Sequence, residues 1–536
     1  MSGRPATPYL ADARVALPDT RALSSPLAIC LILTVLAAAL RLYHLGDLPA
    51  WRDETVVYWL GEDSLTRLWS RDLALTGTHP PLFYTIHHFW NQLLAALAIV
   101  PSEVTIRLPS VMIGTLTIPV FYGVLGRCFG NRIAAIGSAF LAASPAHVEF
   151  SRTAKSEVLV VFLLILMVGF AVRLLARLEH LPRASLRDKG FLGLCAGYVL
   201  SAIGLLHAHS LGFMGLFIPS LLFATLFLSG RLRISAVPIW IVLNLLAVVV
   251  FIPWLVLLYE IARANTGYYW LRPISAQNAV AIFSHVLLDK YHPDAQGPDA
   301  PILMNMIAAA LAASLVIIGC ARALKGDARR RGVAIAFVLL PVLFFAVSQM
   351  KPVFWDYILE MFALPLLALL AGFALEAPSL GRAGQAAAIA GIVLFLLPAE
   401  QVVYRGDPEP WNDVAAFLAS HTENNDPVLF SPPHAGWSVR FYWPTGTDKW
   451  RTLDRGPNVD FDPIHMIPSI PAGAAGDFVR DARRVWLVTD EKVVPNGDDL
   501  PALRAILSAR LPLVTRETFA SGLTVFSYAR DQAATR

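Results

Sequence analysis

Charged residues and cysteines are both scarce in this sequence. Only 15% of the 536 residues are charged and 56% are hydrophobic, which is too apolar for an ordinary soluble domain. The four cysteines fall in or beside apolar runs, so neither a metal cluster nor a disulfide framework is expected. The basic residues form short clusters and no continuous face, which argues against nucleic acid as a partner. The composition predicts a polytopic membrane protein.

The sequence also lacks a fixed-period repeat and any long low-complexity tract. It has instead about eleven apolar runs, each long enough to span a bilayer. The runs cover residues 26–43, 108–126, 132–147, 156–176, 190–206, 210–229, 234–258, 302–321, 332–348, 356–375 and 384–400. A polar tail, residues 1–25, precedes the first run. Arg41 and His44 follow that run in place of a small-residue cleavage site, so we expect a retained anchor.

One further segment, 81–100, decides the topology. It is apolar enough to span, but it carries His87, His88, Asn91 and Gln92. If it lies along the surface as an amphipathic helix, the dense Arg and Lys clusters of later loops join the amino-terminal tail on the cytoplasmic side. The same choice places the first loop, 44–107, and the carboxyl terminus on the exported side. We therefore predict a multi-pass protein of the inner (plasma) membrane with an exported carboxyl-terminal domain.

The composition changes to that of a soluble domain from about residue 401. Trp411 to Ser420 has helical spacing, and three stretches read as short strands bounded by turn residues: 428–431, 485–489 and 523–528. The predicted fold class is an all-α membrane bundle over 26–400, with a juxtamembrane amphipathic helix, and a small exported α/β domain over 401–536.

A pair of carboxylates, Asp53 and Glu54, follows the first apolar run closely. Ionised groups beside a membrane span are expensive and are often present for chemistry. The alternative is a pair of solvated loop carboxylates. We take Asp53 as the centre of a candidate active site on the outer face. Glu54 is better suited to orient a neighbour or to cap the start of a helix.

Four motifs resemble, in order and spacing, those of one superfamily. They are Asp53-Glu54, then His79-Pro80-Pro81-Leu82, then Arg107-Leu108-Pro109-Ser110, and finally Ser144-Pro145 followed by Ser151-Arg152 and Glu157. This set resembles the polyprenyl-phosphate-sugar-dependent glycosyltransferases of the GT-C fold. The grouping includes protein O-mannosyltransferases (family 39), the lipid A aminoarabinose transferases and the rhizobial galacturonosyltransferases (family 83). The resemblance is strongest over residues 42–172.

The resemblance implies a membrane glycosyltransferase in which Asp53 is the catalytic base and Glu157 the acidic residue of the second outer loop. His79 matches the family's His-Pro-Pro position, and Arg107 matches the arginine near the donor. Thr78-His79 stands where the aminoarabinose enzymes have Glu-Lys, which puts transfer of that amino sugar in doubt. The expected reaction moves a hexosyl or glycuronosyl unit from a polyprenyl-phosphate carrier to a hydroxyl of a lipid, glycan or protein.

A leaving phosphate needs cations around it. The candidates at the outer boundary are Arg107, Arg152, Lys155 and Lys351, with His79 beside them. We favour Arg107, because it precedes a span whose first residues would be buried in the bundle. Arginine binds phosphate bidentately, whereas lysine acts as a point charge. The alternative for Lys155 and Lys351 is a side chain that snorkels to the interface.

Trp355 and Tyr357 either contact the donor's lipid or sugar or belong to the interfacial aromatic belt. His207 and His209 are interpreted as polar residues at a helix end. No cofactor is certain and no metal site is predicted; the carboxylates could serve as base, as ligands or as both, so a divalent metal stays open.

Two other functions compete. A transporter or lipid-linked-sugar flippase would favour charges and Gly or Pro breaks near span centres in matched halves, and these runs show few. A non-catalytic scaffold would depend on the carboxyl-terminal domain alone. The donor sugar, the polyprenol, the acceptor and the oligomeric state cannot be read from the sequence.

Overall fold

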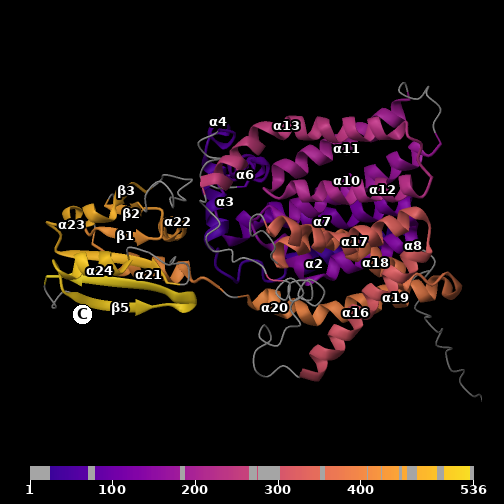
Figure 1. Ribbon diagram of the computed structural model, residues 1–536. Helices are drawn as coiled ribbons and strands as arrows, with labels where there is room; N and C mark the ends of the chain where they lie inside the picture. The colour runs from indigo at the N-terminus through magenta and orange to yellow at the C-terminus, as the bar shows by residue number, and fades with distance from the viewer. Residues whose placement is uncertain are drawn as a thin grey trace, which may run out of the picture.

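The computed structural model describes residues 25–70, 79–180, 188–264, 275, 302–349, 356–406, 408–423, 425–445, 449–454, 467–491 and 500–530. Within these ranges the chain forms a helical bundle with a separate α/β domain at one end of it (Figure 1). Lys351, Trp355 and the polar tail, apart from Ser25, lie outside the described residues.

The bundle follows the predicted apolar runs. Its elements are α2 (Pro26–Leu42), α7 (Glu103–Phe129), α8 (Asn131–Ala143), α9 (Pro145–Arg152), α10 (Glu157–Leu178), α11 (Lys189–Ala208), η2 (Gly212–Leu216), α12 (Phe217–Leu228), α13 (Ala236–Ala264), α16 (Ile302–Lys325), α17 (Ala328–Ser348), α18 (Asp356–Leu375), η3 (Pro378–Leu380), α19 (Gly381–Leu396), η4 (Leu397–Ala399) and α20 (Glu400–Arg405). Among the described residues, 7 helices are long and apolar enough to cross a membrane, or 8 if the bent pair α8–α9 is one span. The polytopic helical bundle is confirmed, and each predicted run coincides with a helix or with consecutive helices. The count of eleven spans stays a prediction.

Two helices form the centre of the bundle. The apolar window of α18 is 89% buried and that of α10 is 72% buried, against 22% for the peripheral α13. Small residues let neighbouring helices approach α18 closely. A Cβ added at Gly137 of α8 would lie 2.8 Å from the Ala368 carbonyl oxygen, and one at Gly319 of α16 would lie 2.4 Å from that of Leu370. Glycine is therefore required where these backbones meet.

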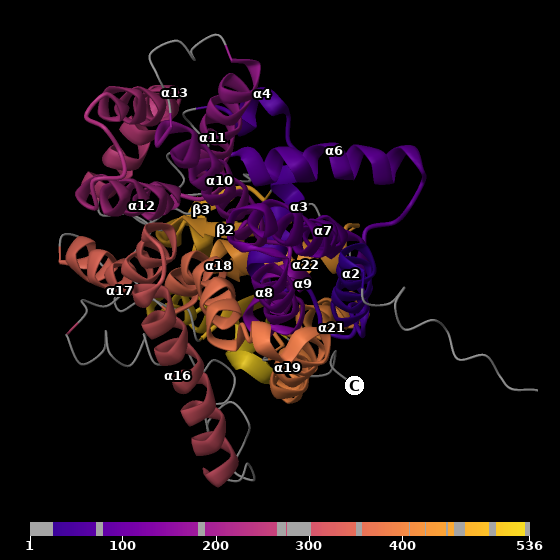
Figure 2. The same cartoon turned by 90° about the vertical axis from the view of Figure 1, so that its right-hand side faces the viewer.

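The described residues of the first loop, 44–70 and 79–107, form three helices before α7: α3 (Arg52–Glu62), α4 (Leu65–Leu68) and α6 (Leu82–Ala96). Helix α6 lies across the bundle axis and does not run with the spanning helices (Figure 2). It buries His87 and Asn91 and exposes Phe89 and Leu93. This orientation agrees with the prediction that the segment lies along the surface, at the end of the bundle nearest the α/β domain (Figure 1).

The bend between α8 and α9 is stabilised by a buried arginine. Pro145 has no N–H, so the carbonyl of Leu141 loses its helical partner and the two helices meet at 58°. Arg41 of α2 donates from Nη2 to Leu141 O (3.3 Å) and from Nη1 to Ala142 O (3.2 Å). Arg41 is fully buried. It thereby satisfies carbonyls that the bilayer could not, and the bend turns α9 toward the candidate site.

The α/β domain has one six-stranded sheet in the order β3-β2-β1-β4-β6-β5. The strands are β1 (Val428–Ser431), β2 (Trp450–Asp454), β3 (Ser469–Pro471), β4 (Arg484–Asp490), β5 (Leu513–Thr518) and β6 (Leu523–Ala529). Strands β1 to β4 are parallel along the row, and β6 is antiparallel to both β4 and β5. The three predicted strands correspond to β1, β4 and β6.

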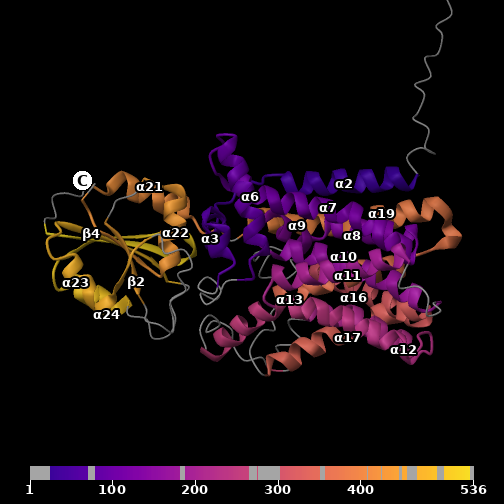
Figure 3. The same ribbon diagram turned by 90° about the horizontal axis from the view of Figure 1, so that it is seen from above.

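Helices cover both faces of the sheet (Figure 3). They are α21 (Trp411–His421), α22 (Pro433–Tyr442), α23 (Ala475–Phe478) and α24 (Leu500–Ser508), with the short turns η5 (Ala472–Ala474) and η6 (Ala520–Gly522). Strand β4 is buried throughout, and its alternate side chains enter two separate cores. Trp486 and Val488 pack with α21 and α22, whereas Val485 and Leu487 pack with α24. The predicted small α/β domain is confirmed.

Replacing Arg41 with methionine should lower the midpoint of thermal unfolding in detergent by several degrees. The variant removes the Arg41 hydrogen bonds to both carbonyls; Leu141 O keeps His147 Nδ1 at 3.1 Å, whereas Ala142 O loses the donor that Arg41 supplies, and an orphaned buried group costs about 1–3 kcal/mol. Arg480→Met, at a side chain 64% exposed, is the matched control and should unfold like the wild type. An Arg41→Met variant as stable as the control would contradict the role given to Arg41.

Candidate active site

Asp53 and Glu54 occupy the first turn of α3 and point to different places. Successive residues on a helix are about 100° apart, so the two carboxylates cannot share an environment. The Asp53 side chain is 43% exposed, whereas that of Glu54 is 1% exposed. Only Asp53 is open to a substrate.

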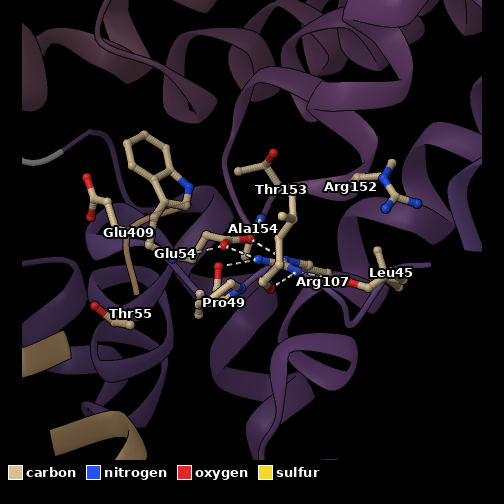
Figure 4. Close-up of polar contacts among 12 residues, drawn as sticks. Leu45, Pro49, Glu54, Thr55, Arg107, Arg152, Thr153, Ala154 and Glu409 are labelled. Carbon is tan, nitrogen blue, oxygen red and sulfur yellow. Dashed lines mark hydrogen bonds and ion pairs between the residues drawn. The ribbon is translucent and has the colours of Figure 1, made fainter. Parts of the chain in front are cut away.

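Glu54 forms a buried, bidentate ion pair with Arg107 of α7 (Figure 4). The Arg107 Nε donates to Glu54 Oε1 (2.8 Å) and Nη2 donates to Oε2 (2.7 Å). Glu54 also accepts the backbone N–H groups of Ala154 (2.9 Å) and Trp51 (3.3 Å). Glu54 therefore joins α3, α7 and the connection after α9, and it closes the amino-terminal turn of its own helix as a capping residue.

Arg107 has no N–H group left for a phosphate. Besides Glu54, its guanidinium donates to the backbone carbonyls of Leu45 (2.8 Å), Leu48 (2.9 Å) and Pro49 (3.0 Å). These contacts engage all the donors that a guanidinium possesses. The arrangement does not support the predicted direct contact with the donor; Arg107 instead fixes the loop that leads into α3.

Arg152 is engaged in a similar way at the end of α2. It donates to the carbonyls of Arg41 (2.9 Å) and His44 (3.0 Å) and also to Tyr43. Its guanidinium stacks over the ring of Tyr404 at 4.7 Å. A cation at the carboxyl end of a helix satisfies carbonyls that have no helical partner. In this structure Arg152 is a cap for α2, and its contact with the phosphate stays a prediction.

Lys155 lies between the two acids that the sequence analysis singled out. Its Nζ is 3.3 Å from Asp53 Oδ2 and 3.2 Å from Glu157 Oε1. The ammonium also sits 4.9 Å from the ring centroids of both Trp51 and Tyr357. Asp53 and the 2%-exposed Glu157 therefore lie together at one end of the bundle, with Lys155 as the cation that joins them.

The charges of this cluster support one another. Desolvation acts to raise the pKa of Asp53, but the positive charges of Lys155 and Arg52 outweigh it and hold that pKa below its ordinary value. For Lys155, desolvation acts to lower the pKa, and the carboxylates of Glu157 and Asp53 raise it above the ordinary value. Asp53 is thus an ionised acceptor at neutral pH and Lys155 is a cation.

Two histidines stack beside the cluster. The rings of His79 and His209 are 4.1 Å apart, and His79 Nδ1 lies 3.2 Å from the hydroxyl of Ser210. Burial lowers the pKa of both imidazoles, so they are neutral at neutral pH. The N–H of Leu211 donates to His209 Nδ1 (3.1 Å), which leaves the proton of this neutral ring on Nε2.

Sequence reasoning missed His209, Ser210 and Trp51. His209 was interpreted only as a polar residue at a helix end. Its position at the end of α11, close to the predicted outer surface, could have indicated that it lies near the site. Tyr357 lies over Lys155 and meets Phe150 edge-on at 4.8 Å. Lys351 and Trp355 are outside the described residues.

The described part of the chain contains no group of three metal-ligating side chains. Between Asp53 and Glu157, the ammonium of Lys155 already supplies the positive charge. The arrangement thus combines an accessible carboxylate, a cation and neutral imidazole donors at one end of an apolar bundle.

Comparisons with known proteins show which family part of the chain is similar to. Residues 78–257 match a family model described as dolichyl-phosphate-mannose-protein mannosyltransferase. No curated protein sequence matches the chain.

Solved structures share the fold over nearly the whole chain. ArnT from Cupriavidus metallidurans in the apo state is similar with a TM-score of 0.61 and 13% identity, over 94% of this chain and 98% of that one. The same protein bound to undecaprenyl phosphate has a TM-score of 0.59 and 14% identity, again over 94% of this chain and 98% of that one. A third similar structure is the archaeal oligosaccharyltransferase AglB from Archaeoglobus fulgidus, in complex with an inhibitory peptide and a dolichol-phosphate. Its TM-score is 0.56 and its identity 12%, over 95% of this chain and 74% of that one.

Removing the charge of Arg107 should destabilise the protein strongly. Arg107→Met leaves Glu54 buried and unpaired, which costs about 3–5 kcal/mol. Thermal unfolding in detergent should show a large fall for this variant. Arg516→Gln, which breaks an exposed pair with Glu491, is the control and should change little. A fully stable Arg107→Met protein would mean that the pair does not organise this end of the bundle.

Proposed function

We propose that the chain is a polyprenyl-phosphate-sugar-dependent glycosyltransferase with Asp53 as its general base. Residues 78–257 match a family model described as dolichyl-phosphate-mannose-protein mannosyltransferase, and ArnT shares the fold over 94% of the chain. The observation that carries this proposal is the contrast between neighbours. Asp53 is ionised and accessible, whereas Glu54 is buried and fully engaged with Arg107. A base must reach the hydroxyl whose proton it takes.

The proposed reaction is a single displacement. As the acceptor oxygen forms a bond to the anomeric carbon, its proton passes to Asp53. The bond between that carbon and the phosphate oxygen breaks, and the electron pair leaves with the polyprenyl phosphate. Such an inverting transfer needs one base and no second carboxylate acting as nucleophile.

Lys155 is the residue best placed to receive the leaving phosphate. Its ammonium is a point charge that can turn from Asp53 and Glu157 toward an anion. In contrast, Arg107 donates to Glu54 and to backbone carbonyls, and both Nη atoms of Arg152 donate to backbone carbonyls. Glu157 would then hold Lys155 in place while charge develops on the phosphate. His79 and His209 are neutral and can donate hydrogen bonds to the donor without adding charge.

A small cavity lies beside α18 inside the bundle. It has a volume of ≈ 60 Å³ and lies between the α8–α9 bend and α16, α18 and α19. Ser144 and Pro145 line it on one side and Glu360 and Leu364 on another. Glu360 follows Tyr357 by about one turn, so both residues are on the same side of α18. We propose that the isoprenoid chain approaches the Lys155 cluster along this side of α18.

The acceptor hydroxyl belongs to a lipid, a glycan or a protein on the exported face of the inner membrane. A transporter or flippase, the main alternative, would place its charged site near the middle of the membrane. Here the Asp53–Lys155–Glu157 cluster lies where helices begin, at the end of the bundle that carries the α/β domain (Figure 1). This position favours transfer at a membrane surface.

Replacing Asp53 with asparagine should abolish sugar transfer while leaving the fold intact. Loss of a general base lowers the rate by about 10²–10⁴-fold. In cells that lack the chain, wild type should restore the missing sugar mass on an envelope lipid or glycan, and Asp53→Asn should not. Purified Asp53→Asn should still bind undecaprenyl phosphate.

Asp63→Asn, at the other end of the same helix, is the matched control and should restore the product. Full restoration by Asp53→Asn would refute the assignment of the base.

Replacing Lys155 with glutamine should weaken binding of undecaprenyl phosphate and narrow the pH range of activity. Lys155 lowers the pKa of Asp53, so its loss raises that pKa. A base is active when deprotonated, so the acidic limb of the rate profile should move to higher pH. The rate of transfer in membrane vesicles, followed across acidic to neutral pH with the sugar identified by mass, measures this shift. An unmoved acidic limb would show that Lys155 does not act on Asp53.

A further inference from the structure

Helix α3, which carries Asp53, lacks a cap from the residue that precedes it. Trp51 stands at the N-cap position and its side chain makes no capping hydrogen bond. The first helical N–H, that of Arg52, donates instead to Glu409 Oε2 (3.1 Å), which lies 357 residues further along the chain. A carboxylate at this position satisfies an orphaned donor and favours the helix dipole. Glu409, which lies beside the α/β domain, thus caps the start of α3.

The side chain of Arg52 connects the same two parts of the molecule. Its Nη1 is 3.3 Å from Asp490 Oδ2 and 3.6 Å from Glu409 Oε1, while its Nε is 3.8 Å from Asp53 Oδ1. The side chain of Asp490 is only 2% exposed, and its Oδ2 also meets His434 Nε2 at 3.1 Å. The indole N–H of Trp411 holds Glu409 at 2.9 Å. Arg52 is therefore shared between Asp53 and two acids that lie outside the bundle.

Asp490 and His434 occupy a distinctive place in the sheet. Asp490 ends β4, and His434 lies in the first turn of α22, directly after β1. Strands β1 and β4 are parallel neighbours, but β2 and β3 continue from β1 on its other side. This is the topological switch point, where open parallel sheets bind their ligands. In this protein Arg52 of the bundle enters that position.

Helix α22 also runs against α3 (Figures 1 and 3). The hydroxyls of Thr55 and Ser438 form a hydrogen bond of 3.2 Å, and the indole N–H of Trp59 donates to the Trp437 carbonyl at 3.0 Å. These contacts hold the α/β domain in one register along the helix that bears Asp53. A shift of either helix would move Arg52 away from Asp490.

We infer that the α/β domain completes the active site, with Glu409 and Asp490 as positioning residues that act on Asp53 through Arg52. This inference rests on the proposed function of Asp53. Both acids anchor the Arg52 guanidinium and the first turn of α3, so the carboxylate of Asp53 keeps one orientation toward the acceptor. A displacement of about 1 Å at a reacting group can cost 10²-fold in rate, so a fixed first turn matters for transfer.

A double-mutant cycle tests this inference. The variants are Arg52→Gln, Asp490→Asn and the two combined, each assayed for the initial rate of transfer in vesicles and for binding of undecaprenyl phosphate. We expect each single change to lower the rate by about tenfold or more, and the double variant to be no slower than the slower single variant, because both remove the same contact. Binding of undecaprenyl phosphate should stay within about twofold of the wild type, since neither residue touches Lys155.

The exposed pair of Arg516 and Glu491, also 3.3 Å apart, provides the matched control cycle, and its variants should transfer at the wild-type rate. If Asp490→Asn does not fold, Glu409→Gln takes its place in the cycle. Wild-type rates in the single variants, or losses that simply multiply in the double variant, would overturn the inference. Activity of Asp53→Asn would overturn the proposed function itself, whereas an inactive Asp53→Asn beside a fully active Asp490→Asn would overturn only the role of the α/β domain.

Discussion

The buried ion pair between Glu54 and Arg107 organises the functional end of this molecule. It joins the loop after α2, the first turn of α3, the start of α7 and the backbone at Ala154. Asp53 is the direct neighbour of Glu54, and Lys155 is the direct neighbour of Ala154. A pair that fixes those two backbone positions therefore fixes the distance between the candidate base and its cation. Removing one partner of such a pair lowers the free energy of unfolding by more than the intact pair contributes to it, because the other charge is left unpaired in an apolar environment.

The cations near the site divide into two kinds. Arg41, Arg107 and Arg152 each donate to several backbone carbonyls, which belong to a helix break, to the loop before α3 and to the end of α2, respectively. A guanidinium suits this task because it offers many donors in a fixed plane. Within the described residues, the ammonium of Lys155 contacts carboxylates and ring faces in place of such a set of backbone carbonyls. It is consequently the cation that can exchange partners when a phosphate arrives.

The α/β domain and the bundle share the helix that carries Asp53. The bundle holds α3 through Glu54, and the domain holds it through Glu409, Asp490 and the face of α22. A helix of 11 residues would be marginal on its own. Fixing it from both sides gives the exposed Asp53 a defined direction without burying it.

The positions of the helices and the existence of the α/β domain could be predicted, because hydrophobic run length and composition are local properties of the chain. The sequence also singled out Asp53, Glu157 and Lys155. It also separated Asp53 from Glu54, which it assigned to orienting a neighbour or capping a helix start, but among the cations at the same predicted boundary it ranked Arg107 ahead of Lys155. Only the tertiary structure decided which of them are engaged with backbone carbonyls, and it alone brought Glu409, Asp490 and His209 to the site. Those assignments depend on contacts between segments far apart along the chain, for which local pattern carries no signal.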